Sequence, residues 1–164
     1  MKQTILITGA SGFIGTFFFN YLKSKNYNVY GVDFNIFKKE DNNIFDIDLI
    51  NFDEKKKLFN KIKPDFIFHL AAFAGPPRNE KDPDLAYKYN VGLVKVVLKD
   101  LDRSVPIFFP STDKIFTGQK FPNEDTILNP DNVHGKLKLE CENLIRNHTK
   151  KHFIMRQPVV HSSG

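Results

Sequence analysis

Glycines near the start of the chain have the spacing of a phosphate-binding loop. Gly9, Gly12 and Gly15 lie in the segment TGASGFIG, between a predicted strand and a predicted helix. Gly9 would permit a tight turn, Gly12 would let the backbone approach a pyrophosphate, and Gly15 would let helix and strand pack closely. The free N–H groups and the positive dipole end of the helix would attract a phosphate. The strand before this loop and the helix after it favour dinucleotide binding over an ordinary glycine-rich turn.

An acidic residue follows at the distance expected for ribose recognition. Asp33 ends the second predicted strand, 24 residues after Gly9. A carboxylate at this place accepts hydrogen bonds from both ribose hydroxyls of NAD and would repel the 2′-phosphate of NADP. The next two residues offer no positive clamp for that phosphate, whereas Lys38 and Lys39 lie farther along. The sequence therefore predicts NAD as the cofactor and leaves NADP as the less favoured alternative.

A second group of polar residues could perform proton chemistry. His134 and Lys138 are four residues apart on a predicted helix, so their side chains share one face. An imidazole can donate or accept a proton near neutral pH. Because a neighbouring ammonium lowers the pKa of an imidazole, we expect His134 to be neutral and a weak acid. The stretch Ser111–Asp113 follows a predicted strand and, taken alone, is typical of a polar loop cap.

These residues are positioned by strands that alternate with helices along the chain. We predict strands at residues 4–8, 28–33, 43–46, 65–70, 105–110 and 152–156, and helices at residues 12–25, 53–62, 83–101 and 133–148. The run at 65–70 is almost wholly apolar, as a central parallel strand should be. Repeated alternation with right-handed crossovers predicts an α/β fold, a doubly wound parallel sheet of the Rossmann-like kind. We expect residues 1–164 to form one such domain.

Composition and charge exclude several classes of protein. Of the 164 residues, 41% are hydrophobic and 26% charged, which excludes a disordered or collagen-like chain. No apolar run reaches the roughly 18 residues of a membrane span. The single cysteine, Cys141, excludes an internal disulfide and favours a reducing, cytoplasmic setting. His148 and His152 straddle a helix end without an accompanying glutamate, so we expect no metal site there.

The net charge of +5 comes almost entirely from lysines, which are scattered along the chain. Nucleic-acid surfaces usually use arginine and exposed aromatic residues. The densest basic run, Lys55–Lys57, is predicted to be a solvated helix face, and the 17 phenylalanines are predicted to lie mostly in the core. We therefore expect neither nucleic acid nor a membrane as a partner.

Several motifs together resemble one enzyme family. They are TGASGFIG at 8–15, Asp46-Ile47, His69-Leu70-Ala71-Ala72, Asn90-Val91, STDKIF at 111–116, the segment from Asn129-Pro130 to Glu140, and Arg156-Gln157-Pro158. They are similar to motifs of the extended short-chain dehydrogenase/reductase family, specifically its NAD-dependent epimerase/dehydratase group. The stretch STDKIF resembles the dTDP-4-dehydrorhamnose reductase-like branch. The segment ending at Glu140 resembles the family pattern P-x-x-x-Y-G-x-x-K, in which Lys138 matches the catalytic lysine.

The resemblance implies a cofactor site and a catalytic site. The implied cofactor-binding residues are Gly9, Ser11, Gly12, Phe13, Ile14, Gly15, Asp33, Asp46, Ile47, Leu70, Ala71, Ala72, Asn90 and Lys138. In that family Asp46 would bond the adenine amino group, and Lys138 would hold the nicotinamide ribose. Thr112 would hydrogen-bond a substrate oxygen, with Asp113 assisting. The implied function is hydride transfer at a carbon of a nucleotide sugar. Arg78, in the loop at 75–78, is either a contact for a phosphate of that substrate or a solvated loop arginine.

The chain departs from the family pattern in one residue and in length. His134 stands where the family has the tyrosine that transfers the proton. Either His134 transfers the proton in place of the tyrosine, or the site has lost catalysis and kept cofactor binding. A third alternative is that Tyr87 or Tyr89, on another helix, transfers the proton. The family continues beyond strand six into a substrate domain, which we expect to be absent from a chain ending at Gly164. The alternative function is therefore a non-catalytic dinucleotide-binding module, a pseudoenzyme or a fragment.

The resemblance also implies an assembly. In the family, the helices that match residues 83–101 and 133–148 often form a four-helix contact between two subunits. We therefore expect a possible homodimer through these two helices, with a nucleotide sugar as the small-molecule partner.

Overall fold

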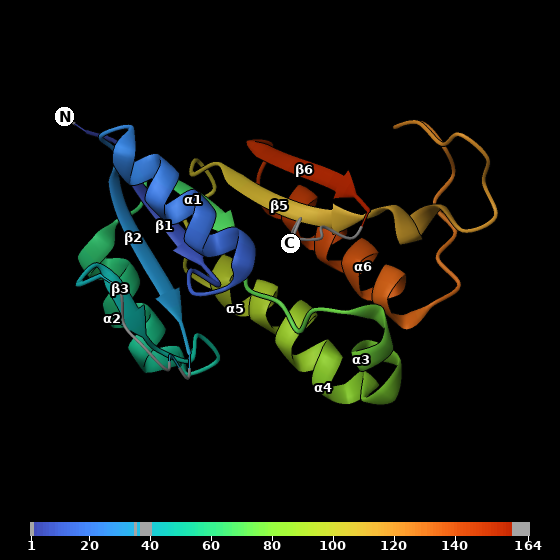
Figure 1. The fold of residues 1–164 in the computed structure, drawn as a ribbon, viewed down its shortest axis with the longest axis horizontal. Helices are drawn as coiled ribbons and strands as arrows, with labels where there is room; N and C mark the ends of the chain where they lie inside the picture. Colours follow the sequence, from blue (N-terminus) through green and yellow to red (C-terminus); the bar gives the residue numbers. More distant parts are fainter. Residues whose placement is uncertain (1, 35, 37–40, 159–164) are drawn as a thin grey trace.

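A parallel sheet of six strands runs through the computed structural model, which describes residues 2–34, 36 and 41–158 (Figure 1). The strands are β1 (Thr4–Thr8), β2 (Asn28–Asp33), β3 (Ile44–Asp46), β4 (Phe66–His69), β5 (Ile107–Thr112) and β6 (His152–Gln157). Their order is β3-β2-β1-β4-β5-β6, and every neighbouring pair is parallel. The strand order reverses between β1 and β4, where sheets of this kind bind ligands. The predicted doubly wound, Rossmann-like α/β fold is therefore confirmed.

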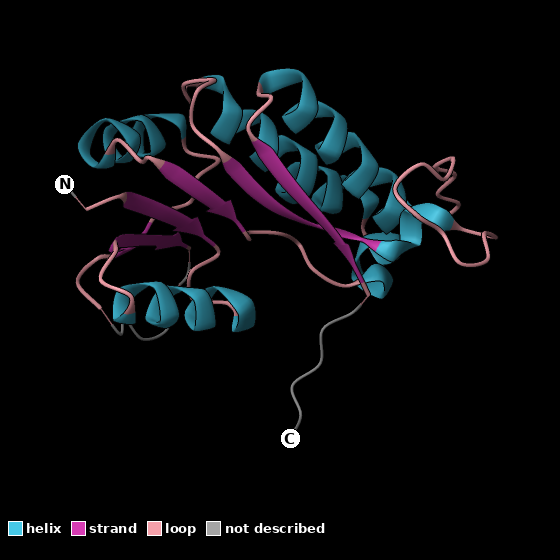
Figure 2. Ribbon diagram, turned by 90° about the horizontal axis from the view of Figure 1, so that it is seen from above, coloured by secondary structure: helices cyan, strands magenta, loops and turns pink. Residues whose placement is uncertain are grey.

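Helices cover the two faces of this sheet (Figure 2). They are α1 (Phe13–Ser24), α2 (Phe52–Ile62), α3 (Pro76–Lys81), α4 (Pro83–Tyr87), α5 (Leu93–Lys99) and α6 (Val133–His148), with a π-helical turn η1 (Lys88–Gly92) and a 3-10 turn η2 (Asp113–Phe116). α1 packs on one face, where a smaller apolar cluster includes Ile5, Ile7 and Phe19. α2, α5 and α6 pack on the other face over a larger cluster that includes Leu6 and Ile67.

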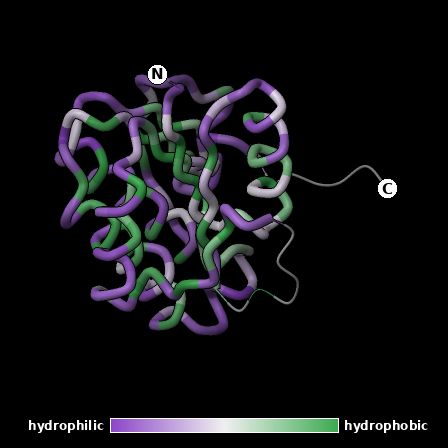
Figure 3. Tube along the Cα trace, turned by 90° about the vertical axis from the view of Figure 1, so that its left-hand side faces the viewer, coloured by the Kyte–Doolittle hydropathy of each residue, from purple (hydrophilic) through white to green (hydrophobic). Residues whose placement is uncertain are grey.

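Alternation of side chains along β1 explains why the sheet has two cores. Leu6 points to the larger cluster, whereas Ile5 and Ile7 point to the smaller one. Because both faces are buried, the strand reads as a continuous apolar run. Figure 3 shows hydrophobic segments running through the middle of the molecule and hydrophilic segments along much of its outline. Within the described residues, no helix has both the length and the apolar character that a membrane crossing requires.

The helix predicted at residues 83–101 is interrupted. The structure divides it into α4, η1 and α5, and it ends at Lys99. The Asn90 side chain supplies the physical reason, because its Nδ2 donates to the Ala86 carbonyl oxygen at 2.8 Å. In a regular α-helix the backbone N–H of Asn90 would take that carbonyl. A π-helical turn within a helix often marks a functional site.

Two segments that were predicted as loops belong to a helix and to a strand. Residues 75–78, predicted as a loop, include the start of α3, with Pro76 at its first position, where proline is well tolerated. The fifth strand was predicted at 105–110, but β5 extends to Thr112 because Ser111 and Thr112 pair with Arg156 and Gln157 of β6. Ser111 and Thr112 are therefore strand residues, and Thr112 also caps the turn η2 that follows.

The prediction that Lys55–Lys57 forms a solvated face is wrong for its first residue. Lys55 is fully buried, and its ammonium donates to the Val96 carbonyl oxygen at 3.0 Å and pairs with Asp100. The long lysine stem crosses from α2 to α5, and the ammonium meets oxygen atoms at its end. The run of lysines in the sequence therefore did not identify which side of α2 faces solvent.

The prediction that the phenylalanines lie mostly in the core is confirmed for the described residues, because four are buried and Phe18, Phe45, Phe66, Phe68 and Phe73 pack partly buried against the two apolar clusters. Those classed as buried are Phe19, Phe59, Phe108 and Phe109, whereas Phe13, Phe17, Phe34, Phe121 and Phe153 are exposed. Phe13 and Phe17 lie four residues apart on the outer side of α1, and both are 65% exposed. A helix with aromatic residues on more than one side can bury only the side that meets the sheet.

Candidate functional site

A cavity of about 830 Å³ lies at the carboxyl edge of the sheet. Ligand sites in proteins typically have volumes of roughly 300–1,000 Å³. The cavity extends over the glycine loop, the ends of β2, β4 and β5, and the first turns of α6. The predicted site residues that line it are Gly9, Gly12, Phe13, Ile14, Gly15, Asp33, Ile47, Leu70, Ala71, Ala72, Thr112, His134 and Lys138. Residues predicted to act together thus lie along one cavity, although more than a hundred positions separate the first from the last.

The remaining predicted site residues, Ser11, Asp46, Asn90 and Asp113, do not line the cavity. Asp46 is exposed at the end of β3, and Asp48, two residues later, lines the cavity instead. Asn90 is buried, and its amide bonds to backbone carbonyls. Ser11 and Asp113 instead contact residues that do line the cavity, as described below.

The glycine loop brings the backbone of α1 close to β1 and β4. Gly9 has φ +70°, and a Cβ atom on Gly15 would lie 2.0 Å from the Gly9 carbonyl oxygen. A Cβ atom on Gly12 would meet only that same oxygen, at 3.2 Å. Gly12 is also the N-cap of α1, with no side-chain cap and no acidic residue in the first turn. The first N–H groups of α1 are therefore open to the cavity and fit a phosphate.

Asp33 is held at the end of β2 by two backbone donors. Its Oδ2 accepts from the Ser11 N–H at 2.9 Å, and its Oδ1 accepts from the Phe34 N–H at 3.0 Å. The carboxylate is thus oriented beside the glycine loop while it lines the cavity. The rings of Phe34 and Tyr89 stack at 5.6 Å on the same cavity wall. Lys38 and Lys39, the basic residues considered for NADP, lie outside the described residues.

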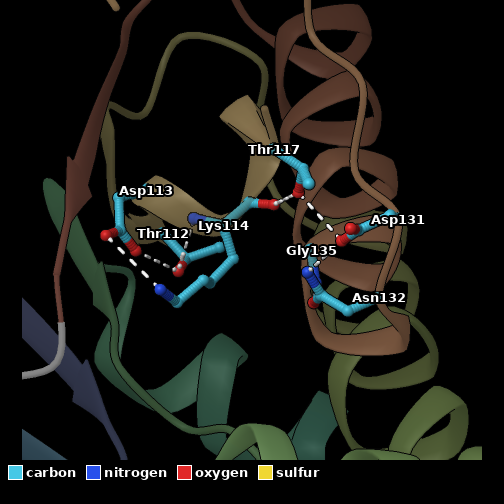
Figure 4. Close-up of polar contacts among 7 residues, drawn as sticks. All are labelled: Thr112, Asp113, Lys114, Thr117, Asp131, Asn132 and Gly135. Atoms are coloured by element: carbon cyan, nitrogen blue, oxygen red, sulfur yellow. Dashed lines mark hydrogen bonds and ion pairs between the residues drawn. The ribbon is translucent and has the colours of Figure 1, made fainter. Parts of the chain in front are cut away.

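The end of β5 carries two hydroxyl groups: that of Thr112 is hydrogen-bonded (Figure 4), whereas that of Ser111 has no partner in the described part of the chain. Thr112 Oγ1 accepts from the Lys114 N–H at 3.2 Å and donates to Asp113 Oδ1 at 3.3 Å, so it caps η2. Ser111 Oγ is buried without a hydrogen-bond partner among the described residues, and Ser111 lines the cavity. A buried hydroxyl without a partner is costly unless a ligand or water satisfies it. Ser111 is therefore a site residue that the sequence pattern did not single out.

The N-terminus of α6 places His134 and Lys138 against β5. Asn132 caps the helix by accepting from the Gly135 N–H at 2.8 Å (Figure 4). A Cβ atom on Gly135 would lie 2.7 Å from the Lys114 carbonyl oxygen, so the glycine permits α6 to approach η2. Lys138 Nζ donates to the Pro110 carbonyl oxygen at 2.9 Å. Burial lowers the pKa of this buried lysine.

His134 is neutral at physiological pH. Burial, followed by the nearby Lys138 ammonium, lowers the pKa of His134 to about 4. The sequence predicted this direction from neighbouring positive charge, and the structure adds burial as the larger cause. The imidazole Nδ1 lies 2.8 Å from Oδ1 of Asn79 in α3. Of the two tyrosines considered as substitutes, Tyr87 does not line the cavity and its hydroxyl donates to Glu140 at 3.1 Å. Tyr89 does line the cavity, with its ring stacked on Phe34.

His69 at the end of β4 makes the stability of the fold depend on pH. The ring is buried, with Nδ1 at 2.9 Å from Thr8 Oγ1 and Nε2 without a partner among the described residues. Burial, followed by the Lys138 charge, lowers the pKa of His69 from 6.5 to about 3. The unfolded chain therefore binds a proton below pH 6.5 that the folded chain excludes.

We expect the free energy of unfolding to fall as the pH is lowered through 6.5, the ordinary pKa of His69. Between pH 7.5 and pH 5, His69 alone should remove about 2 kcal/mol. Urea denaturation at the two pH values measures the loss. A His69→Gln variant, which has no titratable group at this place, should lose less over the same range. An equal loss in both proteins would assign the effect to other groups.

A doubly wound parallel sheet, an open glycine loop and a cavity at the carboxyl edge define a Rossmann-like domain of the short-chain dehydrogenase/reductase kind. The model of the family described as RmlD substrate binding domain matches residues 1–164. The chain belongs to this family, and its relatives include dTDP-4-dehydrorhamnose reductases.

The matches to individual relatives cover nearly all of this chain but only about half of each relative. "Methionine adenosyltransferase 2 subunit beta" of Danio rerio is 28% identical over 159 residues, which are 96% of this chain and 48% of the relative. "Spore coat polysaccharide biosynthesis protein SpsK" of Bacillus subtilis is 31% identical over 163 residues, 98% of this chain and 54% of the relative. The structure of dTDP-4-dehydrorhamnose reductase from Bacillus anthracis in complex with NADP has a TM-score of 0.77 and 26% identity, and the match covers 95% of this chain and 53% of that one. The chain thus spans about half the length of the curated relatives it matches.

Proposed function

We propose that the chain is the dinucleotide-binding part of an NAD-dependent epimerase/dehydratase or reductase that acts on a nucleotide sugar. The observation that carries this proposal is the single cavity that joins the glycine loop and Asp33 to Ser111, His134 and Lys138. A relative of known structure, named dTDP-4-dehydrorhamnose reductase, was determined in complex with NADP. The name of the Bacillus subtilis relative refers to polysaccharide biosynthesis.

The residues at the glycine-loop end of the cavity fit a dinucleotide. The open N–H groups of α1 would hold the pyrophosphate, because Gly12 leaves the approach free of a side chain. Asp33, already oriented by Ser11 and Phe34, would accept from the ribose hydroxyls. The negative charge of Asp33 would repel a 2′-phosphate, which favours NAD over NADP. NADP remains the alternative because the relative from Bacillus anthracis binds it.

The residues at the other end would bind the reacting part of the substrate and move a proton. A bound nicotinamide dinucleotide supplies the centre that takes up or releases hydride. Lys138, fixed by the Pro110 carbonyl, would hold a ribose hydroxyl, and Thr112, fixed by Asp113, would contact a substrate oxygen. Ser111 Oγ offers a further hydroxyl for that oxygen. His134 would exchange the proton in the place of the family tyrosine.

The test is a fluorescence titration of the purified chain with NADH and, in parallel, NADPH. We expect NADH to bind at least about tenfold more tightly, a difference of about 1.4 kcal/mol. Asp33→Asn removes the charge and, because an amide has one acceptor oxygen, keeps one of the two backbone hydrogen bonds, so it should reduce this ratio severalfold. Asp48→Asn removes another carboxylate of the cavity lining and should leave the ratio unchanged. Absence of binding by both nucleotides would refute the proposed cofactor site.

A second candidate function is a dinucleotide-binding module without catalysis. His134 in the place of tyrosine favours it, as does a relative that is named as a subunit of methionine adenosyltransferase. Incubation with NAD and a panel of nucleotide sugars separates the two candidates. Turnover supports the enzyme, whereas NADH binding without turnover supports the module. The homodimer contact through residues 83–101 and 133–148 stays a prediction.

A further inference from the structure

We propose that Asn79 fixes the tautomer of His134, so that the imidazole offers an unprotonated Nε2 to the cavity and accepts a hydrogen bond there. Asn79 is a positioning residue in this proposal. It lies in α3, a helix that the sequence pattern did not predict, and it is fully buried. The proposal deepens the proposed function, because it specifies what kind of group the ligand presents to His134.

The orientation of the Asn79 amide follows from its second partner. Asn79 Nδ2 lies 2.7 Å from the Phe73 carbonyl oxygen. A carbonyl oxygen can only accept, so the atom that faces it must be the amide nitrogen. The amide oxygen therefore faces His134, at 2.8 Å from Nδ1. Because that oxygen can only accept, His134 Nδ1 must carry the hydrogen.

The other ring nitrogen is left for a ligand. His134 is half-buried and lines the cavity, and the hydrogen bonds among the described residues include none to Nε2. A neutral imidazole has one protonated nitrogen, so protonation at Nδ1 leaves a lone pair at Nε2. The contrast with tyrosine is chemical, because a phenol can both donate and accept, whereas this imidazole can only accept.

The charges around the ring oppose protonation at Nε2. Lys138 on the same helix and Lys114 of η2 lower the pKa of His134, whereas Asp113 of η2 and Glu80 of α3 raise it. Burial outweighs the two carboxylates, so the net direction is downward. The resting ring is therefore neutral near neutral pH, and its tautomer decides which hydrogen bonds it can make.

Hydrogen bonds fix α3 against α6, so Asn79 keeps its orientation toward His134 and selects the tautomer. Glu80 Oε1 accepts from the Val133 N–H at 2.6 Å, in the first turn of α6. Adjacent residues of α3 thus contact adjacent residues of α6. Phe73, whose carbonyl orients Asn79, also accepts from Asn90 Nδ2 at 3.4 Å. The amide of Asn79 cannot rotate without losing its buried bond to that carbonyl.

The chemical consequence concerns the substrate. A hydroxyl group opposite Nε2 can donate to it, whereas a carbonyl oxygen finds no donor in His134. The structure therefore favours the hydroxyl form of the sugar carbon over its keto form at this position. His134 would receive the hydroxyl proton, and the oxygen would keep the bonding pair of the broken O–H bond.

The tautomer can be measured directly by ¹⁵N NMR of protein labelled at histidine nitrogens. At pH 7, long-range correlations from the ring protons distinguish a protonated nitrogen from an unprotonated one, and the spectrum of His134→Gln assigns the signal. We expect a protonated Nδ1 and an unprotonated Nε2. A protonated Nε2 in the wild-type protein would overturn the proposal, and this measurement needs no variant of Asn79.

Variants of Asn79 test whether this residue makes the choice. Asn79→Asp keeps an acceptor and should retain the Nδ1–H form while it raises the pKa of His134 in a pH titration. Asn79→Leu removes the acceptor, so signals of the Nε2–H form should appear. Glu80→Gln, next to it on α3, is the matched control and should keep Nδ1–H. An unchanged tautomer in Asn79→Leu would overturn the role of Asn79. Failure of NADH binding would instead count against the proposed function and leave the spectrum unaffected.

Discussion

Replacing Gly15 by alanine is expected to lower the free energy of unfolding by about 3 kcal/mol or more, at the upper end of what overpacking usually costs. The added Cβ would lie 2.0 Å from the Gly9 carbonyl oxygen and 2.9 Å from the Ala10 Cα atom. Both are backbone atoms, so no side chain can rotate away. The start of α1 would have to move away from β1, and the apolar contacts of Phe19 and Leu22 with the sheet would loosen.

The glycine three residues earlier provides the control. In Gly12→Ala the added Cβ meets only the Gly9 carbonyl oxygen, at 3.2 Å. We expect a loss of stability below about 1 kcal/mol. The same methyl group would stand where a phosphate approaches, so NADH binding should weaken much more than stability. Chemical denaturation and the NADH titration separate the two effects. Equal stability of Gly15→Ala and wild type would show that the loop is less tightly packed than the structure indicates.

Replacing Glu142 by glutamine is expected to destabilise the chain by about 3 kcal/mol. Glu142 is fully buried in α6, and its carboxylate accepts from Arg156 Nε at 3.1 Å and from Nη2 at 2.8 Å. A glutamine keeps the volume but leaves the Arg156 guanidinium, whose side chain is 15% exposed, without a full countercharge. Arg146 on the next turn, with Nη2 at 3.7 Å from Glu142, adds to the uncompensated charge.

A second, exposed glutamate on the same helix provides the control for Glu142→Gln. Glu140 lies two positions earlier and pairs with Lys95 at 3.4 Å, with both side chains largely exposed to solvent. Glu140→Gln should therefore cost less than about 1 kcal/mol. The double variant Glu142→Leu with Arg156→Met should recover part of the loss, because it removes both buried charges. Similar losses for Glu142→Gln and Glu140→Gln would contradict the importance of the buried pair.

This ion pair also bears on the candidate site. Arg156 lies in β6, and Lys138 lies one helical turn before Glu142 on α6. The pair therefore joins α6 to the sheet close to the lysine that contacts the Pro110 carbonyl. We expect Glu142→Gln to weaken NADH binding as well, because Lys138 would be held less firmly.

The sequence by itself determined the fold class and the glycine-loop half of the candidate site. Apolar runs that alternate with helical patterns predict a doubly wound sheet, because each pattern is local to a few residues. The glycine spacing, Asp33 at the end of a strand, and the four-residue interval from His134 to Lys138 are local as well. These features needed no knowledge of which distant segments meet.

Only the tertiary structure decided the partners of the reactive groups. Asn79 and His134 are 55 positions apart, and their contact depends on how α3 packs against α6. Ser111 lies in β5 because pairing with β6 extends that strand, and its buried hydroxyl has no partner in the part of the chain that the structure describes. Lys55 can be buried because the carbonyl oxygen of Val96, 41 positions away, accepts a hydrogen bond from its ammonium. Burial and hydrogen bonding are properties of the surroundings, which long-range packing supplies, and residue types along the chain do not specify them.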